Sequence, residues 1–540
     1  MATLTRETLQ EKLLEHKNIR HLLEGRAQQY GDKTFLIWDG DFISYRQIDE
    51  MSNRAANALL GLGLNVGDRV AIMMANSPEW LAIWFGAVKI GAVIVPINTA
   101  YKGDGLAYQL ADSNASVLAV DGDLVSRLAV LEPAPSIPNI YVGATGEGGH
   151  PAIDSSPLVD LFDAPSAPPP AVTLEPHDPA TILYTSGTTG VPKGCVLPHG
   201  QYLAAAFIHS DNCEYGTDTV IYTCLPLFHI NAQNYTILSA LSAGATIAMD
   251  KRFSASAFWN RLIETGATAF NFIGSMAVSL WNRPPVAAEK QHKARVAFGV
   301  PIPLDLWGEW EERFQTRVVY AYGMTENALP AIFPLSETPV PSRLRGTAGK
   351  ASPAAEVAIV DERDWPVGPG VVGEIVTRPT VPWTMMTEYL GKPEASIEAF
   401  HGCWFHTGDL GYLDEDGYLF YVDRKKDALR RKGEMVSSWE VETAVGKFDA
   451  VAECAVVGIP SEMGEDEIMI VVVPKEGTCF DPRELLVFCE ERIAKFQIPR
   501  YVRTVESLPR TQTQRVEKYK LRLEGITPDT WDSRASVASV

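Results

Sequence analysis

A run of small hydroxyl residues, glycines and a lysine follows an apolar, strand-like segment. Residues 181–194 read TILYTSGTTGVPKG. Glycines let a backbone approach a ligand closely, and successive N–H groups together with Ser and Thr hydroxyls bind phosphate oxygens. Lys193 adds a positive charge for the same oxygens. The sequence therefore predicts a phosphate-binding loop made of Thr185, Ser186, Gly187, Thr188, Thr189, Gly190 and Lys193.

The loop is not a Walker A loop, because that motif requires Ser or Thr after the lysine and Gly194 follows here. It resembles instead the most specific signature of the adenylate-forming superfamily, which comprises acyl-CoA ligases, firefly luciferases and peptide-synthetase adenylation domains. Further motifs of that family follow in order, up to about residue 518. The stretch GEMVSSWEVE and the chain length look most like the medium-chain and carnitine/crotonobetaine-CoA-ligase-like branch.

The resemblance implies a nucleotide site around YGMTE (322–326). In the family the tyrosine stacks on adenine, the threonine binds the α-phosphate, and the glutamate helps to hold Mg²⁺. An aromatic face suits a purine and a hard carboxylate suits magnesium. The implied nucleotide contacts beyond the loop are Tyr322, Gly323, Met324, Thr325 and Glu326, with Gly299 and Val300 of FGVPI; Thr185 joins Glu326 at the metal.

Two further motifs complete the implied nucleotide site and its hinge. HTGDLG (406–411) supplies Asp409, which by resemblance accepts the ribose hydroxyls, and Arg424 joins it. Lys426 occupies the position at which the C-terminal domain of family members turns after adenylation, exchanging one catalytic face for another.

LPLFHINAQ (225–233) resembles the segment whose histidine lines the acyl pocket, so His229 is the candidate gate. The apolar residues nearby suit a large hydrophobic carboxylic acid. The acid itself cannot be read from the sequence, and no motif tests the idea of a bacterial natural-product ligase for a diterpenoid acid of the platensimycin type. The expected pocket consists of His229, Gln233, Phe272, Gly274, Met276, Gly299 and Tyr322.

KGEMVSSWEVE (432–442) resembles the face that serves the second half-reaction. Gly433 is expected along the tunnel for the pantetheine arm, because a missing side chain leaves room for the thiol. The implied contacts of coenzyme A are Arg431, Lys432, Gly433 and Glu434.

The implied chemistry has two steps. ATP, with Mg²⁺, converts a carboxylate into an acyl-adenylate and pyrophosphate, and the thiol of coenzyme A then displaces AMP. The protein positions the reactants and stabilises charge at phosphorus and at the carbonyl.

One departure from the family bears on the first step. Family members read L-P-R-T-x-x-G-K where this chain reads LPRTQTQR (508–515), so Gln514 replaces the glycine and Arg515 the lysine. Arginine is a larger planar fork, and glutamine lacks the freedom of glycine. We therefore predict that adenylation is weak or absent, that transfer from acyl-adenylate to CoA is retained, and that a partner ligase supplies the adenylate.

Other functions remain open at this point. Arg515 or Lys518 could replace the lysine, which would make the chain a complete ligase. A free-standing adenylation enzyme that loads a carrier protein, a luciferase-like oxygenase and a non-catalytic acyl-adenylate binder are further alternatives. Retention of Lys193 and Glu326 argues against a non-catalytic binder.

Composition narrows the class of protein. Forty-seven basic and 67 acidic residues give a net charge of −20, which disfavours binding to nucleic acid or to an anionic membrane. Seven scattered cysteines without a CxxC pair indicate reduced thiols rather than a disulfide framework. The N-terminus lacks an apolar signal core, so a cytoplasmic location is expected.

Strand-like and helical patterns alternate through the first 420 residues, as in RVAIMM, PEWLAIWFGAVKIG and AVIVPI. This predicts an α/β fold with mainly parallel sheets in layered subdomains. YLDEDGYLFYV reads as two strands around an Asp-Gly turn, and Asp481 as the N-cap of a helix that begins at Pro482. We expect a large N-terminal domain (1–423), a small mobile α+β domain (424–527) and a disordered tail (528–540).

Overall fold

The structure is a computed structural model of the chain. It describes residues 4–534 except 133, 144–151, 186–191, 301, 303–305, 426–428, 432–433, 437, 461–465, 491, 494, 496 and 511–515. At 300, 430, 434, 435, 439 and 440 it describes only the backbone. The predicted site residues that lie outside the described residues are Ser186, Gly187, Thr188, Thr189, Gly190, Lys426, Lys432, Gly433 and Arg515.

The chain divides into two compact units. Unit 1 comprises Met1–Val357, Thr377–Phe405 and Asp416–Leu419. Unit 2 comprises Ala358–Val376, His406–Glu415 and Phe420–Val540, so it contains the predicted C-terminal domain together with two earlier segments.

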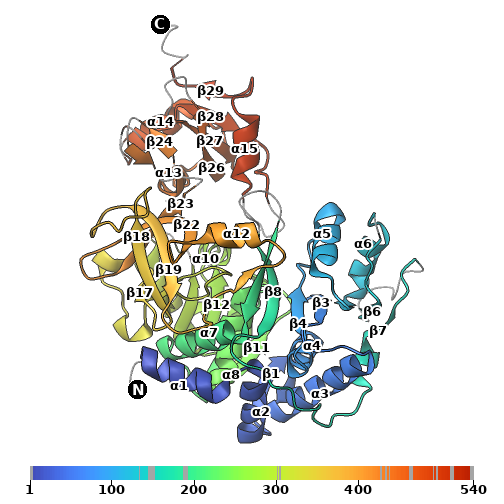
Figure 1. Cartoon of the computed structure of the whole chain (residues 1–540). Coiled ribbons are helices and arrows are strands. Elements are labelled where there is room, and N and C mark those ends of the chain that lie inside the picture. Colours follow the sequence, from blue (N-terminus) through green and yellow to red (C-terminus); the bar gives the residue numbers. More distant parts are fainter. Residues whose placement is uncertain are drawn as a thin grey trace. The chain divides into compact units, whose positions relative to one another are not determined.

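An eight-stranded sheet in unit 1 carries the ends of the predicted phosphate loop (Figure 1). The strands β3 to β8 pair in parallel, whereas β9 pairs antiparallel with both β8 and β20. Helix α4 (Pro78–Lys89) follows β3 and begins where the Ser77 hydroxyl accepts a hydrogen bond from the Trp80 N–H. The strand order is β20 (Glu388–Tyr389), β9 (Lys193–Pro198), β8 (Pro179–Thr185), β4 (Val93–Pro96), β3 (Arg69–Met73), β5 (Val117–Val120), β6 (Asn139–Val142) and β7 (Ser156–Pro157).

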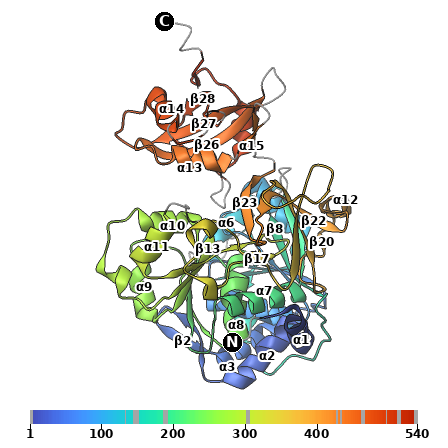
Figure 2. The same cartoon turned by 90° about the vertical axis from the view of Figure 1, so that its left-hand side faces the viewer.

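A second sheet in unit 1 has seven strands, and all its neighbours are parallel except β1 and β2. Figure 2 shows α9, α10 and α11 grouped beside β13. The strand order is β14 (Arg317–Val319), β13 (Val296–Val300), β12 (Ala269–Ile273), β10 (Val220–Thr223), β11 (Thr246–Met249), β1 (Thr34–Trp38) and β2 (Asp41–Ser44). The two mainly parallel sheets confirm the predicted α/β class.

The other helices of unit 1 flank these sheets. A π-helical segment, η3 (Asn231–Leu238), leads into α8. The helices are α1 (Arg6–His16), α2 (Ile19–Tyr30), α3 (Tyr45–Gly61), α5 (Gly103–Ser113), α6 (Val125–Ala129), α7 (His199–Asn212), α8 (Ser239–Ala243), α9 (Phe258–Thr265), α10 (Gly274–Trp281), α11 (Trp307–Phe314) and α12 (Pro393–Ala399).

Two smaller sheets follow along the chain. β15 (Ala321–Tyr322), β16 (Ala331–Ile332) and β17 (Lys350–Ala351) pair antiparallel. The predicted hairpin around Asp416 and Gly417 is present as β22 and β23. Its sheet has the order β18 (Ala355–Val360), β19 (Gly373–Pro379), β22 (Trp404–Leu413) and β21 (Phe400–His401), with β23 (Leu419–Arg424) also paired to β22.

The C-terminal part of unit 2 is an α+β structure, in which α13, α14 and α15 lie around a four-stranded sheet (Figure 1). Asp481 caps α14, because its carboxylate accepts a hydrogen bond of 2.8 Å from the Arg483 N–H, as predicted. The segment that we expected to be disordered includes β29, which pairs with β28. The elements are β24 (Leu429–Arg431), β25 (Glu434–Val436), α13 (Ser438–Val445), β26 (Val451–Pro460), β27 (Asp466–Pro474), α14 (Pro482–Glu490), β28 (Tyr501–Thr504), α15 (Lys518–Glu524) and β29 (Trp531–Asp532).

In the described part of the chain, no helix has both the length and the apolar character needed to cross a bilayer.

A buried cation joins α3 to α4 in unit 1. Lys89, at the end of α4, is fully buried, and its ammonium lies 2.5 Å from Asp49 Oδ1 and 2.5 Å from Asn53 Oδ1. Burial lowers the pKa of Lys89, and the Asp49 carboxylate opposes that shift. The Asp49 carboxylate therefore stabilises the positive charge of the buried Lys89 ammonium, which water does not reach.

We predict that Asp49→Ala lowers the free energy of unfolding of unit 1 by about 3 kcal/mol at pH 7, because it leaves a buried ammonium without its counter-charge. The pKa of Lys89 falls further in the variant, so the unfolded chain binds the proton more tightly than the folded chain. The loss should therefore shrink as the pH rises from 7 toward 10. Urea unfolding followed by tryptophan fluorescence measures this loss of unfolding free energy. Glu50→Ala, which changes an exposed neighbour, is the control. A loss that is the same at every pH would contradict the prediction.

Candidate active site

The ends of the predicted phosphate loop are fixed by strand pairing. Thr185 ends β8, Lys193 begins β9, and the two residues are paired across the antiparallel ladder. Between them only Pro192 lies within the described residues. The Thr185 hydroxyl lies 3.9 Å from the Cys195 thiol. Cys195 follows Lys193 on the same face of β9, because successive side chains of a strand point to opposite faces.

The segment 323–328 forms a tight turn after β15. Met324 N–H donates to the Asn327 carbonyl at 2.9 Å, and a Cβ on Gly323 would lie 2.2 Å from the Ala328 carbonyl oxygen. Only glycine therefore fits at position 323. Tyr322 precedes the turn on β15 and is 7% exposed.

Backbone contacts from two other segments hold Thr325 and Glu326. The Gln201 side-chain amide on α7 donates to the Thr325 carbonyl at 2.9 Å, and Met386 N–H donates to the Glu326 carbonyl at 2.8 Å. Both predicted side chains therefore stand on a backbone that is tied to α7 and to the segment before β20.

One buried tyrosine links the two charged residues of this site. Tyr389, on β20, donates its hydroxyl to Glu326 Oε1 at 3.0 Å. The ammonium of Lys193 lies 4.9 Å from the centre of the same ring. Burial, and then the charge of Glu326, raises the pKa of the Tyr389 hydroxyl and likewise that of the Cys195 thiol. Glu326, Lys193, Cys195 and Tyr389 therefore form one cluster.

The predicted metal ligands fit magnesium by their chemistry. Thr185 offers a hydroxyl oxygen and Glu326 a carboxylate oxygen, and Cys195 neighbours both residues. Hard oxygen donors are the ligands that Mg²⁺ prefers, and it keeps several of its waters when only one or two protein groups bind it.

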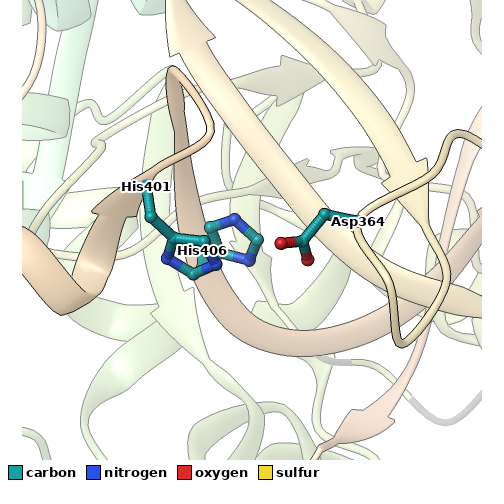
Figure 3. Close-up of side chains that lie close together, drawn as sticks. All are labelled: Asp364, His401 and His406. Atoms are coloured by element: carbon teal, nitrogen blue, oxygen red, sulfur yellow. The ribbon is translucent and has the colours of Figure 1, made fainter.

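Figure 3 labels three other side chains of metal-binding types, Asp364, His401 and His406. Asp364 and His401 are exposed. None of the three is a predicted ligand, and exposed groups of these types are common without a metal, so we assign no metal to them.

Two predicted pocket residues approach each other across the second sheet. Phe272 on β12 is paired with Gly299 on β13, and a Cβ on Gly299 would lie 2.2 Å from the Phe272 carbonyl oxygen. The Phe272 ring packs against Trp310 at 5.5 Å. Gly274 begins α10, on which Met276 is buried, and the backbone of Val300 pairs with Ile273.

The segment 225–233 contains two predicted pocket residues, His229 and Gln233, whose surroundings differ. His229 precedes η3, and its ring lies 4.7 Å from the Phe228 ring. Gln233 is fully buried; its amide nitrogen donates to the Leu227 carbonyl at 2.6 Å, and its amide oxygen accepts from the Tyr202 hydroxyl at 2.5 Å. The nitrogen and the oxygen of the Gln233 amide are thus both engaged inside the fold, which disfavours a direct contact with substrate.

In unit 2, the two residues predicted to bind ribose lie together. Arg424 Nε is 2.9 Å from Asp409 Oδ1, and Asp409 is 2% exposed. The Asp409 N–H donates to the Thr407 hydroxyl, which in turn donates to the Ile375 carbonyl at 2.6 Å. Strand β22 therefore presents a rigid carboxylate beside a guanidinium.

A buried carboxylate that the sequence did not suggest supports this segment. Glu374 on β19 accepts from the Gly408 N–H at 3.1 Å and from the Lys425 ammonium at 2.7 Å, and His406 lies 3.4 Å away. Burial alone would raise the pKa of Glu374, but Lys425, His406 and the Gly408 N–H together lower it below its ordinary value. Glu374 thus holds the segment just before Asp409 and the side chain of Lys425, which follows Arg424.

The predicted coenzyme A segment flanks a hairpin in unit 2. Arg431 and Glu434 pair across β24 and β25, and the intervening Lys432 and Gly433 lie outside the described residues. Arg431 itself is buried, and its guanidinium is 2.8 Å from Glu467. That ion pair disfavours the predicted contact between Arg431 and coenzyme A.

Lys518, the residue that could replace the family lysine, is also engaged. Its ammonium donates to the Ser438 hydroxyl at 2.6 Å and lies 2.8 Å from Glu442 Oε1. Ser438 donates in turn to Asp423 at 2.8 Å, and the Glu442 carboxylate also accepts from the Val456 N–H at 2.6 Å. Lys518 therefore belongs to a buried polar network that joins α15, α13, β26 and the end of β23.

Sequence reasoning missed Tyr389, Glu374, Cys195 and the Lys518–Glu442 pair. Each acts through residues that are distant along the chain, as Tyr389 does with Glu326. The only sequence signal for Tyr389 was its place in TEYLGK, a short strand-like stretch close to the PWTMM segment.

Comparisons with known proteins agree over nearly the whole chain. Residues 23–390 match the AMP-binding enzyme family, and residues 440–515 match the C-terminal domain of AMP-binding enzymes. A crotonobetaine/carnitine–CoA ligase of Salmonella paratyphi A is 33% identical over 515 residues, which cover 94% of this chain and 99% of that protein.

Solved structures give the same result. The anthranilate CoA ligase AuaEII in complex with anthranoyl-AMP has a TM-score of 0.84 at 26% identity, covering 94% of this chain and 97% of that one. ATP-bound MatB from Rhodopseudomonas palustris has a TM-score of 0.82 at 27% identity, covering 94% and 99%. A benzoate CoA ligase from Burkholderia xenovorans LB400 has a TM-score of 0.81 at 25% identity, covering 94% and 99%.

We predict that Glu374→Gln destabilises unit 2 by about 1–3 kcal/mol at pH 7, because a buried charged acceptor of three donors is lost. Since the folded pKa of Glu374 is lowered, its contribution is complete above the ordinary value of about 4.3 and disappears as the pH falls through the folded value. Melting curves of both proteins should therefore converge in acid. Glu356→Gln, which breaks an exposed pair with Arg378, is the control; curves that stay equally far apart at every pH would count against the prediction.

Proposed function

The chain belongs to the AMP-binding enzyme family and is an acyl-CoA ligase, and from that premise we propose how it divides the ligase reaction. We propose that it transfers the acyl group of an acyl-adenylate to coenzyme A efficiently, whereas it forms the adenylate from free acid and ATP weakly or not at all. A partner ligase would then supply the acyl-adenylate.

The proposed nucleotide contacts in unit 1 agree with what its side chains offer. Tyr322 supplies an aromatic face for adenine and Thr325 a hydroxyl for the α-phosphate. The proposed contacts of the phosphate groups are Lys193, Thr185 and Glu326. A bound Mg²⁺ would reduce the charge of the phosphate oxygens there. Asp409 and Arg424 of unit 2 are the proposed ribose contacts, supported by the short ion pair between them.

The observation that carries the proposal is the engagement of Lys518. Arg515 stands where the family has its lysine, and Lys518 is the alternative cation considered for that role. Its ammonium is held by Ser438 and Glu442, and its side chain is only 16% exposed. Withdrawing it would leave the Glu442 carboxylate buried without its counter-charge, which costs several kcal/mol, roughly 3–5. Arg515 is then left as the cation for adenylation.

An arginine is a poor substitute for a lysine at a reacting phosphorus. Its charge is spread over a planar fork, whereas the lysine ammonium is a compact point charge on a flexible stem. Displacement of one stabilising group from a developing negative charge lowers rates by about 10²–10³-fold.

The second half-reaction needs different residues. The thiol of coenzyme A attacks the acyl carbonyl, the bond from that carbonyl to the phosphate oxygen breaks, AMP leaves, and the thiol proton goes to solvent. Gly433 and Glu434 are the proposed neighbours of the pantetheine arm. Neither requires Arg515.

Complete ATP-dependent ligase activity is the second candidate, and the intact cluster of Lys193, Glu326 and Tyr389 favours it. Loading of a carrier protein in place of coenzyme A is disfavoured by the relatives, since three of those named above are CoA ligases. For the acid we propose a large hydrophobic carboxylic acid, supported by the buried Phe272 and Met276.

We predict that wild-type protein forms acyl-CoA from preformed acyl-adenylates at least about 100-fold faster than from the same free acids with ATP. Single-turnover assays with a panel from benzoate to polycyclic acids identify an accepted acyl group in the first arm and test that acid in the second. Gln514→Gly/Arg515→Lys should gain adenylation. Arg510→Lys, which alters a surface pair with Glu453 and keeps the positive charge, should not. Brisk pyrophosphate release by the wild type with an accepted acid would make the chain a complete ligase.

We also predict that Gly433→Leu lowers thioester formation from acyl-adenylate by about 100-fold, because a side chain in the thiol path misplaces the nucleophile. Binding of the acyl-adenylate, measured by calorimetry, should be unchanged. Gly61→Leu, where a new side chain meets open space, is the control for a glycine replacement. If Gly433→Leu loses adenylate binding as well as thioester formation, the residue is needed for folding and not for the tunnel.

A further inference from the structure

We infer that Tyr389 is a positioning residue that holds the two charged groups of the phosphate site, Glu326 and Lys193, in their working places. The inference rests on the proposed nucleotide function of those two residues. It assigns to Tyr389 no contact with the reacting atoms.

Tyr389 is itself fixed by the edge of the eight-stranded sheet. It is paired with Cys195 across β20 and β9, and the hydrogen bonds of its neighbours, Thr387 N–H to Val196 O at 3.0 Å and Leu390 N–H to Gly194 O at 2.7 Å, secure that pairing. Its own N–H donates to the Ser396 hydroxyl at 2.9 Å. The side chain is 6% exposed, so its ring has little freedom to move.

The Tyr389 hydroxyl orients the Glu326 carboxylate without occupying all of its acceptor positions. An ionised carboxylate has two oxygens with about four acceptor positions. One hydrogen bond to Oε1 therefore fixes the orientation of the group and leaves acceptor positions for a cation. Residues that orient a metal ligand in this way typically change metal affinity by about 10–100-fold when they are altered.

The ring of Tyr389 acts on Lys193 separately. A lysine ammonium within about 6 Å of a ring centre is attracted by the face of the aromatic system, and the distance here is 4.9 Å. The contact gives the flexible lysine a preferred position at the start of β9. Because hydroxyl and ring serve different partners, two substitutions can separate the two effects.

The chain contains a matched control elsewhere in unit 1. Tyr418 donates its hydroxyl to Glu337 at 2.9 Å, and the ammonium of Lys350 lies 4.5 Å from the centre of its ring. The same three residue types thus meet in the same arrangement, with no predicted nucleotide contact among them. Tyr418→Phe tests whether loss of such a hydroxyl disturbs the protein in general.

The experiment measures ATP binding by calorimetry in the presence of Mn²⁺ and in EDTA, together with Mn²⁺ binding by electron paramagnetic resonance. Tyr389→Phe should weaken the Mn²⁺-dependent affinity by about 10-fold and leave the affinity in EDTA unchanged, because only the hydroxyl is lost. Tyr389→Leu should in addition weaken the affinity in EDTA by about 3-fold, because Lys193 loses its ring. Tyr418→Phe should change neither value.

Equal binding by Tyr389→Phe and wild type in Mn²⁺ would overturn the inference while the proposed nucleotide site stands. A Tyr389→Phe protein that loses affinity equally with and without metal would also overturn it, since the effect would then be a general disturbance of the fold. A wild type that binds ATP without any dependence on Mn²⁺ would remove the metal role of Glu326, and the inference with it. Melting curves of every variant, recorded in parallel, identify loss of folding.

Discussion

The charged site of unit 1 depends on one strand, β9, being hydrogen-bonded along both of its edges. Pairing with β8 places Thr185 opposite Lys193, and pairing with β20 places Tyr389 opposite Cys195. Side chains alternate between the two faces of a strand, so Lys193 and Cys195 share one face. A slip of one residue in either register would send half of these groups to the other side of the sheet. Because these groups share one face of the sheet, the tight turn that carries Glu326 needs to approach the sheet from that side only.

Unit 2 arranges several of its charges by a second principle, the pairing of a buried ion with an oppositely charged residue from another part of the chain. Asp409 meets Arg424, Glu374 meets Lys425, Arg431 meets Glu467 and Lys518 meets Glu442. A buried ion pair adds little net stability, but removing one partner is costly. The pairs therefore specify which strands and helices lie together more than they add to stability.

Much of this could be read from the sequence, but not all of it. The α/β class, the hairpin at Asp416, the cap at Asp481 and the strand that leads into the phosphate loop follow from periodicity and turn chemistry, which are local. Tyr389, Glu374 and the Lys518–Glu442 pair depend on contacts between residues 51 to 76 positions apart, as between Glu374 and Lys425. The contacts that disfavour ligand binding by Gln233 and Arg431 are equally invisible to a motif, because Leu227 and Tyr202 hold the first side chain and Glu467 holds the second.

The Lys518 network also bears on how such an enzyme evolves. Arg510 and Val516 bridge each other, Glu517 N–H donates to the Pro509 carbonyl, and Lys518 then anchors the start of α15. Both ends of the stretch 511–515 are thereby secured by residues other than its own. None of these three contacts uses a side chain of residues 511–515, so substitutions at Gln514 and Arg515 need not remove them. A lineage in which the family lysine has become arginine can therefore keep the contacts that anchor the start of α15, and keep them again if the lysine returns.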